Sequence, residues 1–185
     1  LTSIRNGLPG TTMPGFPMAD DKVAQVAGFV RSLTAPAISI QVPGDPERGR
    51  QVFFGAGRCS QCHMILGRGG YPGPDLSNIG AERTVGQLTE SVTKPSARIT
   101  DGYRSAVAAL KSGKTIQGVA KNHNNYSVQI LDKSGRLHLL NNDQIERLEI
   151  GPTSMMPPLP DPGDAPHLVA FLSRQSTRAP KGDSR

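Results

Sequence analysis

The sequence predicts an α+β protein: a mainly helical part into which a small antiparallel β-sheet or barrel is inserted. Apolar residues at helical spacing near the C-terminus, Leu168, Phe171 and Leu172, predict a helix with one buried face. Residues 103–150 instead read as short alternating strands, with turns expected at Ser112-Gly113, Asp132–Gly135 and Asn141–Asp143. The chain holds 21 glycines and 16 prolines among 185 residues, one residue in five, which indicates long connecting loops.

Composition excludes some classes of protein. No apolar run approaches the roughly 20 residues that a membrane-spanning helix needs, so no transmembrane segment is expected. Tryptophan is absent and aromatic residues make up only 4% of the chain. A core with so few rings would be thin, and a large apolar cofactor would fill it.

The two cysteines form the most informative motif, Cys59-Ser-Gln-Cys62-His63. This Cys-x-x-Cys-His pattern is the attachment signature of c-type heme. Each thiol adds to one vinyl group of the porphyrin, and two intervening residues let both sulfurs reach the same ring edge. His63 then lies beneath the ring and offers its imidazole to the iron as the proximal ligand.

The cysteine pair has two other possible interpretations. A thioredoxin-type redox pair would sit in a βαβ pattern, which the flanking sequence lacks. A zinc site would need further ligands, but there is no second cysteine pair and the remaining histidines lack metal-finger spacing. Those histidines are His123, His138 and His167.

The residues around the motif predict its immediate supports. Asp45-Pro46-Glu47 has the pattern of a helix start, and Gly49 lies one turn from Phe53, a spacing that suits close contact with a second helix. Downstream, Gly69 to Leu76 contains too much glycine and proline for a helix and should be a rigid loop. The carbonyl of Pro74 is the expected acceptor for the second ring N–H of His63, and Leu76 is expected to pack on the ring edge.

A sixth ligand for the iron would come from a distant loop. Ser154 to Pro160 is stiffened by proline and carries two thioethers, Met155 and Met156. Methionine sulfur suits heme iron, and His/Met ligation raises the reduction potential. Asp164 is placed to cap the helix that follows, and Phe171 is the expected partner of Gly49.

These motifs, in this order, resemble class I cytochromes c, and most closely a bacterial variety often fused to large periplasmic dehydrogenase or propeller proteins. That variety also carries a stretch like Leu88 to Tyr103, followed by a β-rich insertion. The resemblance covers roughly residues 45–175. It implies a heme-c electron carrier with axial ligands His63 and Met156. Met156 is favoured over Met155 because the family pattern places proline directly after the ligand.

The β-rich insertion, residues 103–150, holds seven Lys and Arg against four Asp and Glu, within a chain of net charge +6. It is either a solvated basic surface or a docking face for an acidic redox partner protein, since charge steers encounter. Nucleic-acid binding is not expected, because no aromatic pair lies on a basic strand.

The N-terminal segment repeats the C-terminal one. Met13-Pro14-Gly-Phe-Pro17 precedes apolar residues at helical spacing, and the 16 residues from Met13 to Phe29 match the 15 from Met156 to Phe171. We therefore expect residues 1–34 to be the C-terminal remnant of a preceding cytochrome c-like domain. The apolar face of that segment should be buried against other protein, a partner or a second copy, and Met13 should lie near a second heme where one is present. That face comprises Val23, Val26, Val30 and Leu33.

We expect residues 35–44 to form a linker, 45–175 a cytochrome c domain with its 103–150 insertion, and 176–185 a disordered tail. The expected function is transport of single electrons by one covalently bound heme c, without enzymatic activity. The alternatives are an electron-accepting heme domain or subunit of a periplasmic dehydrogenase, or a heme peroxidase or redox sensor with a displaceable methionine. The resemblance implies a periplasmic or extracellular location.

Overall fold

The helical part of the chain is built around one crossing of two helices, α3 (Pro46–Phe54) and α6 (Ala165–Leu172). The computed structural model describes residues 2–177, and of residues 31–34 only the backbone. The side chain of Asp45 caps α3 by accepting hydrogen bonds from the backbone N–H groups of Glu47 and Arg48, and Pro46 occupies the first turn. The helix start predicted from Asp45-Pro46-Glu47 is therefore confirmed.

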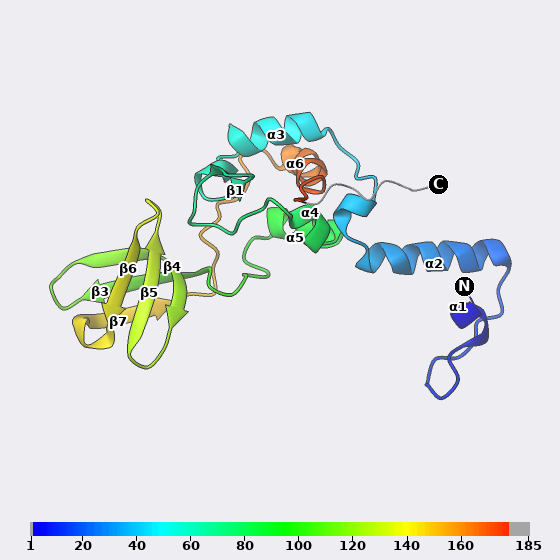
Figure 1. Cartoon of the computed structure of the whole chain (residues 1–185), viewed down its shortest axis with the longest axis horizontal. Coiled ribbons are helices and arrows are strands. Elements are labelled where there is room, and N and C mark those ends of the chain that lie inside the picture. The colour runs from blue at the N-terminus through cyan, green and yellow to red at the C-terminus, as the bar shows by residue number, and fades with distance from the viewer. Residues whose placement is uncertain (1, 178–185) are drawn as a thin grey trace.

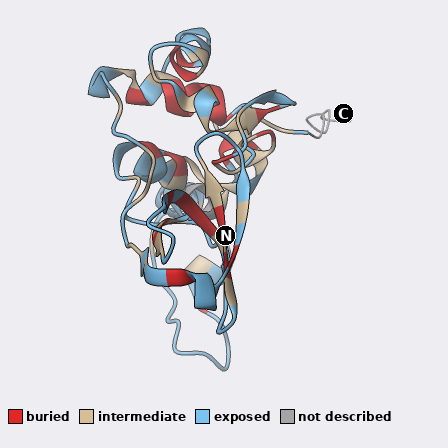
Figure 2. Ribbon diagram, turned by 90° about the vertical axis from the view of Figure 1, so that its left-hand side faces the viewer, coloured by how far each residue is buried: buried red, intermediate tan, exposed pale blue. Residues whose placement is uncertain are grey.

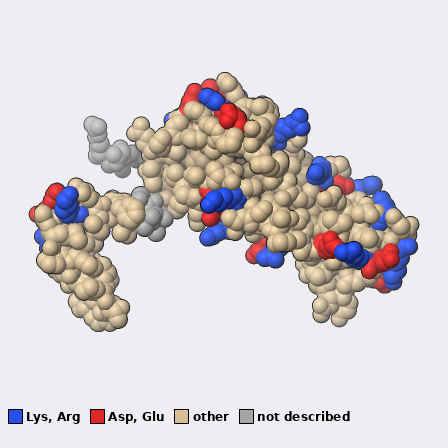
Figure 3. All heavy atoms as spheres, turned by 180° about the vertical axis from the view of Figure 1, so that it is seen from behind, with Lys and Arg blue, Asp and Glu red and all other residues tan. Residues whose placement is uncertain are grey.

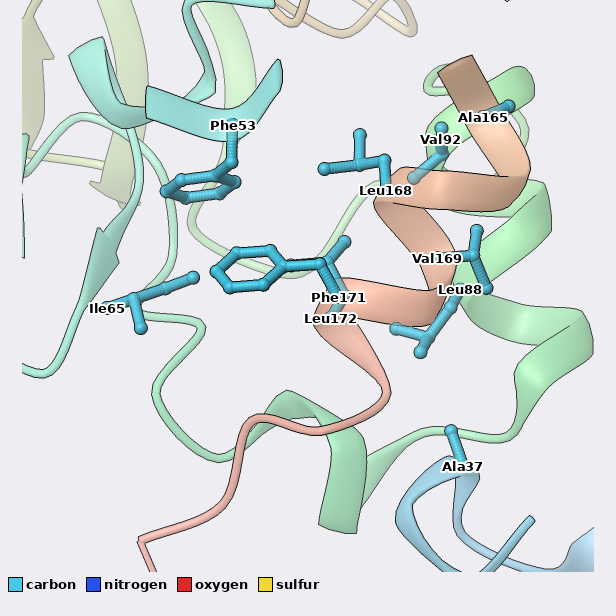
Figure 4. Close-up of a cluster of buried hydrophobic side chains, with 10 residues drawn as sticks. All are labelled: Ala37, Phe53, Ile65, Leu88, Val92, Ala165, Leu168, Val169, Phe171 and Leu172. Carbon is cyan, nitrogen blue, oxygen red and sulfur yellow. The ribbon is translucent and has the colours of Figure 1, made fainter. Parts of the chain in front are cut away.

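Gly49 meets Phe171 at this crossing, as the sequence predicted. A Cβ atom at Gly49 would overlap the carbonyl of His167 and lie 2.8 Å from Cβ of Phe171, so only glycine lets the two helices approach this closely. The Phe171 ring lies 5.7 Å from that of Phe53, centroid to centroid, within one buried apolar cluster (Figure 4). This cluster is the core that holds the two ends of the helical part together.

Shorter elements complete the helical part. They are the 3-10 turns η1 (Ala37–Ser39), η2 (Cys59–Gln61) and η4 (Pro162–Asp164), the two-residue strands β1 (Met64–Ile65) and β2 (Arg68–Gly69), and helices α4 (Ile79–Glu82) and α5 (Val85–Thr93). Leu88 and Val92 of α5 join the core against α6. The segment 35–44, expected as a linker, packs on this body: Ala37 is fully buried, and its N–H donates to the carbonyl of Arg83.

Asp164 does not cap α6 with its side chain, contrary to the sequence-based expectation. It occupies the N-cap position, but its carboxylate accepts from Arg48 of α3, with the side-chain Nε–Oδ1 distance 2.8 Å. The side chain of Asp161 instead accepts from the N–H of Gly163, one turn earlier. A long-range charge pair between the two core helices has taken the place of a local cap.

The insertion forms a five-stranded antiparallel sheet in the order β6-β5-β4-β3-β7. Its strands are β3 (Arg104–Leu110), β4 (Thr115–His123), β5 (Ser127–Asp132), β6 (Leu137–Asn141) and β7 (Ile145–Ile150), with the turn η3 (Asn142–Gln144) before the last. The predicted turns at Ser112-Gly113, Asp132–Gly135 and Asn141–Asp143 are all present. Over residues 104–150, all of which are described, β6 and β7 do not pair, so the sheet does not close into the barrel that was an alternative.

The chain is thus α+β, with two separate buried cores, one in the helical part and one on the sheet (Figure 2). The sheet projects from one side of the helical part (Figure 1). Helices α1 (Thr2–Asn6) and α2 (Asp20–Thr34) lie at the opposite end. Among the described residues, no helix has the length and apolar character to cross a membrane.

The N-terminal helix was expected from its spacing, and α2 is present. In this single chain Val23 is buried, whereas Val26 and Val30 are exposed. The side chain of Leu33 lies outside the described residues. Of the tail expected at 176–185, residues 178–185 also lie outside them, while the N–H and hydroxyl of Thr177 donate to the side-chain oxygen of Asn78.

Candidate heme-binding site

A largely apolar cavity lies where the helical part and the sheet meet. It brings together all six residues that the sequence singled out, together with Met155. The six predicted residues that line the cavity are Cys59, Cys62, His63, Pro74, Leu76 and Met156. They come from three segments separated by up to 97 positions, and the cavity is therefore a product of the tertiary fold.

The cysteine pair is positioned by a tight turn directly after α3. Arg58 adopts a left-handed conformation (φ 53°), and the N–H groups of Cys62 and His63 both donate to the carbonyl of Cys59, at 3.1 and 2.9 Å. Both thiols are half-buried and unpaired with each other. This turn places both sulfurs and the imidazole on the lining of one cavity.

Burial raises the pKa of the Cys59 thiol to about 11. The thiol is therefore protonated at neutral pH. Dithiol oxidoreductases depend on the opposite shift, a lowered pKa that produces a nucleophilic thiolate. The electrostatics of Cys59 thus disfavour the redox-pair interpretation of the motif.

His63 is held by the loop that follows it. Its Nδ1 atom lies 2.9 Å from the carbonyl oxygen of Pro74, the acceptor expected from the sequence. A carbonyl only accepts, so Nδ1 carries the proton and Nε2 keeps its lone pair for a metal. Burial lowers the pKa of His63, more strongly than the Pro74 hydrogen bond raises it, and this favours the neutral imidazole that a metal requires.

The loop itself is bound to the heme motif through its backbone. The N–H of Gly73 donates to the carbonyl of Cys62 at 2.7 Å, and the N–H of Leu76 donates to that of Met64 at 2.8 Å. A Cβ atom at Gly73 would lie 2.7 Å from both Nδ1 and Cε1 of His63. Glycine at this position is therefore what lets the loop pass against the imidazole ring.

The methionine loop reaches the same cavity from the far end of the chain. Met155 and Met156 are both half-buried and both line it. The hydroxyl of Ser154 accepts from the N–H of Met156 at 3.1 Å, and the hydroxyl of Ser96 accepts from the N–H of Ser154 at 3.0 Å. The loop is thereby held on the segment that follows α5.

The other histidines have different surroundings. Nδ1 of His167 accepts from the N–H of Asp45 at 2.9 Å, and Nε2 of His138 lies 2.7 Å from the carboxylate of Asp132. His123 is exposed at the end of β4. Among the described lining residues His63 is the one histidine. No group of three or more His, Cys, Asp or Glu side chains suited to a metal ion occurs within residues 2–177.

The sheet supplies one wall of the cavity, which sequence reasoning did not predict. Val119 of β4, Leu131 of β5 and Lys133 in the following turn line it, together with Tyr103 just before β3. The centroid of the Tyr103 ring lies 3.5 Å from Nζ of Lys121, a cation–π contact. No sequence period marks these positions, because Tyr103 and Lys133 lie outside the strands, and Val119 and Leu131 lie outside the sheet's own core cluster.

The charge of the lining is of one sign. Arg58, Arg83, Arg98 and Lys133 contribute cationic groups, and no Asp or Glu occurs among the described lining residues. Heme c fits these surroundings: its flat apolar ring suits an apolar cavity, and its two propionates suit the cations. Its two thioether links suit the thiols, and its iron suits the imidazole and the methionine thioethers.

Comparison with known proteins supports this assignment. The family model for cytochrome c matches residues 46–148, more than half of the chain. The match begins at the first residue of α3 and includes the Cys59–His63 motif. No curated protein matches the sequence. Membership of this family implies heme c binding, electron transfer and protein redox partners. The chain belongs to the cytochrome c family.

Proposed function

We propose that this chain is a one-electron carrier whose single heme c is attached through thioether bonds to Cys59 and Cys62. His63 and Met156 are the axial ligands in this proposal. Pro74 orients the imidazole of His63, and Leu76 packs beside the porphyrin ring. The observation that carries it is the convergence of two thiols, one neutral imidazole and one thioether loop on a single apolar cavity. When bound, heme c supplies an iron that takes up and releases one electron.

The protein's own groups set the conditions for that exchange. The Pro74 carbonyl keeps the proton of His63 on Nδ1, so Nε2 presents its lone pair in a fixed direction. Apolar residues of α5 and α6, Leu88, Val92, Leu168 and Leu172, line the cavity and exclude water from one side. Both features favour a small structural change around the iron between its oxidised and reduced states, because the ligands are held in place before the electron arrives.

We propose that an acidic redox partner protein approaches the cationic rim of the cavity. Arg58, Arg98 and Lys133 are exposed at the lining and would attract carboxylates of a partner. On the face shown in Figure 3, basic and acidic side chains are interspersed. The family's heme attachment chemistry supports a periplasmic or extracellular location.

Two measurements on the holoprotein test the assignment. Acid and organic extraction should leave the heme with the polypeptide, whereas free heme in the organic layer would refute thioether attachment. Met156→Ala should abolish the weak far-red absorption band of Met–iron ligation, admit small iron ligands and lower the reduction potential by on the order of 0.1 V, since axial ligands set potentials over about 0.8 V.

Met155→Ala is the matched control and should change little. Reversed effects would assign the iron to Met155, and no effect from either would transfer the role to His123, His138 or His167. A high-spin wild-type spectrum would refute the electron carrier and favour the peroxidase or sensor. Reduction of the heme by a dehydrogenase in a stable complex would instead make the chain that enzyme's electron-accepting subunit.

A further inference from the structure

The N-terminal segment repeats the local structure of the methionine loop as well as its sequence. The N–H of Met13 donates to the hydroxyl of Thr11 at 3.2 Å, just as that of Met156 donates to the hydroxyl of Ser154 at 3.1 Å. Proline follows each methionine, and a helix follows each loop. Two segments more than 140 positions apart thus present a methionine in the same local arrangement.

The helices that follow also share their apolar pattern. Counted from the phenylalanine of each helix, three apolar positions of α2 correspond to three of α6: Val26, Phe29 and Val30 to Leu168, Phe171 and Leu172. In α6 the three side chains are 1%, 8% and 6% exposed; in α2 they are 37%, 64% and 52% exposed. Val26 and Val30 are thus exposed in α2, whereas their counterparts Leu168 and Leu172 are buried in α6.

The interface within this chain shows what covers such a face. In the C-terminal copy it is covered by α3, through Gly49 and Phe53, and by α5. Helix α3 leads within five residues into the Cys59–His63 motif. A helix that packs on this face therefore places a Cys-x-x-Cys-His turn beside the methionine of the loop that precedes the face.

We propose that Met13 is an axial ligand of a second heme c, and that α2 packs against the helix of a second Cys-x-x-Cys-His segment built like residues 45–76. This inference rests on the role proposed for Met156. The α3 of this chain cannot be that helix, because α6 already covers it. The β-sheet is excluded as well, since it lies at the opposite end of the molecule (Figure 1).

The step is coordination alone. The thioether sulfur of Met13 donates a lone pair to the open sixth position of an iron whose heme is already bound to the second segment. No covalent bond to this chain forms and no electron is transferred in it. Met13 is 36% exposed in this chain, so the residue is open to approach by such a partner.

The test adds a heme-c peptide with the sequence of residues 45–76 to the full-length holoprotein and follows the far-red band. The wild-type chain should gain close to a second equivalent of Met–iron absorbance. Met13→Ala should lose this gain and keep the first heme's band. Met18→Ala, a methionine in the same segment that no proline follows, is the matched control and should keep both.

A second pair of variants tests the helix face. Val30→Asp should weaken binding of the peptide at least tenfold, whereas Ala24→Asp, on the opposite side of α2, should leave it unchanged. Met156→Ala should remove the first band and keep the gain, so failure of the proposed function is separated from failure of this inference. Absence of any gain in the wild type, or a gain that survives Met13→Ala, would overturn the second site.

Discussion

Nδ1 of His63 lies 2.9 Å from the carbonyl oxygen of Pro74, and Gly73 is the residue that makes this approach feasible. The hydrogen bond fixes both the tautomer and the direction of the imidazole. Two residues of one loop, Gly73 and Pro74, thus decide how the proposed proximal ligand faces the cavity.

The first prediction concerns this loop. Gly73→Ala would place a methyl group 2.7 Å from two ring atoms of His63, so either the ring or the loop must move. Overpacking of this kind costs about 1–3 kcal/mol, and we expect a loss of that size in urea unfolding together with a changed heme spectrum. Gly86→Ala is the control: its added methyl meets nothing closer than 3.9 Å, and alanine in a helix is favoured by up to about 1 kcal/mol.

The second prediction concerns the crossing of α3 and α6. Gly49→Val would force the helix backbones apart, and we expect the free energy of unfolding to fall by about 1–3 kcal/mol or more. Gly28→Val, in α2, adds the same side chain where nothing lies within 4 Å of the new Cβ, and it should be nearly neutral. A loss at Gly49 below about 0.5 kcal/mol, the range of ordinary surface sites, would contradict the close packing.

The third prediction concerns the cationic wall from the sheet. Lys133→Gln removes a positive charge at the cavity, and a nearby cation stabilises the reduced heme. We therefore expect the reduction potential to fall by on the order of 10–50 mV, less at high ionic strength, as Coulomb energies at partly exposed sites indicate. Lys111→Gln, in the turn between β3 and β4 and outside the lining, is the control, and an equal fall there would show a general charge effect.

The fourth prediction concerns the β5–β6 turn and pH. The carboxylate of Asp132 accepts from the hydroxyl of Ser134 at 2.6 Å and pairs with His138, and these contacts hold the pKa of Asp132 well below its usual value. A depressed pKa in the folded state contributes stability that is complete above the unfolded pKa of about 3.9 and is lost as the pH falls through the folded value.

Asp132→Asn should therefore flatten the decline of urea midpoints between about pH 5 and pH 2 relative to the wild type. Ser134→Ala removes the strongest of the stabilising contacts and should flatten it in part. An unchanged acid slope in both variants would show that this turn does not contribute to acid sensitivity.

Much of the local structure of this protein could be predicted from its sequence. The Cys59–His63 spacing, the cap and proline at the start of α3, and the turn at Ser112-Gly113 each act over five residues or fewer. Such short patterns restrict the backbone whatever surrounds them. Helical spacing likewise puts Gly49 and Phe171 each on a defined face of its helix, but it is the packing of α3 against α6 that brings the two residues together.

Tertiary structure decided what depends on contacts between distant segments. Asp164 pairs with Arg48 rather than capping its helix, because α3 brings a guanidinium within reach. The sheet stays open, and Tyr103, Leu131 and Lys133 become a wall of the cavity. Strand periodicity tells which face of a strand is apolar, but the placement of a whole sheet against a helical body depends on packing that no local pattern encodes.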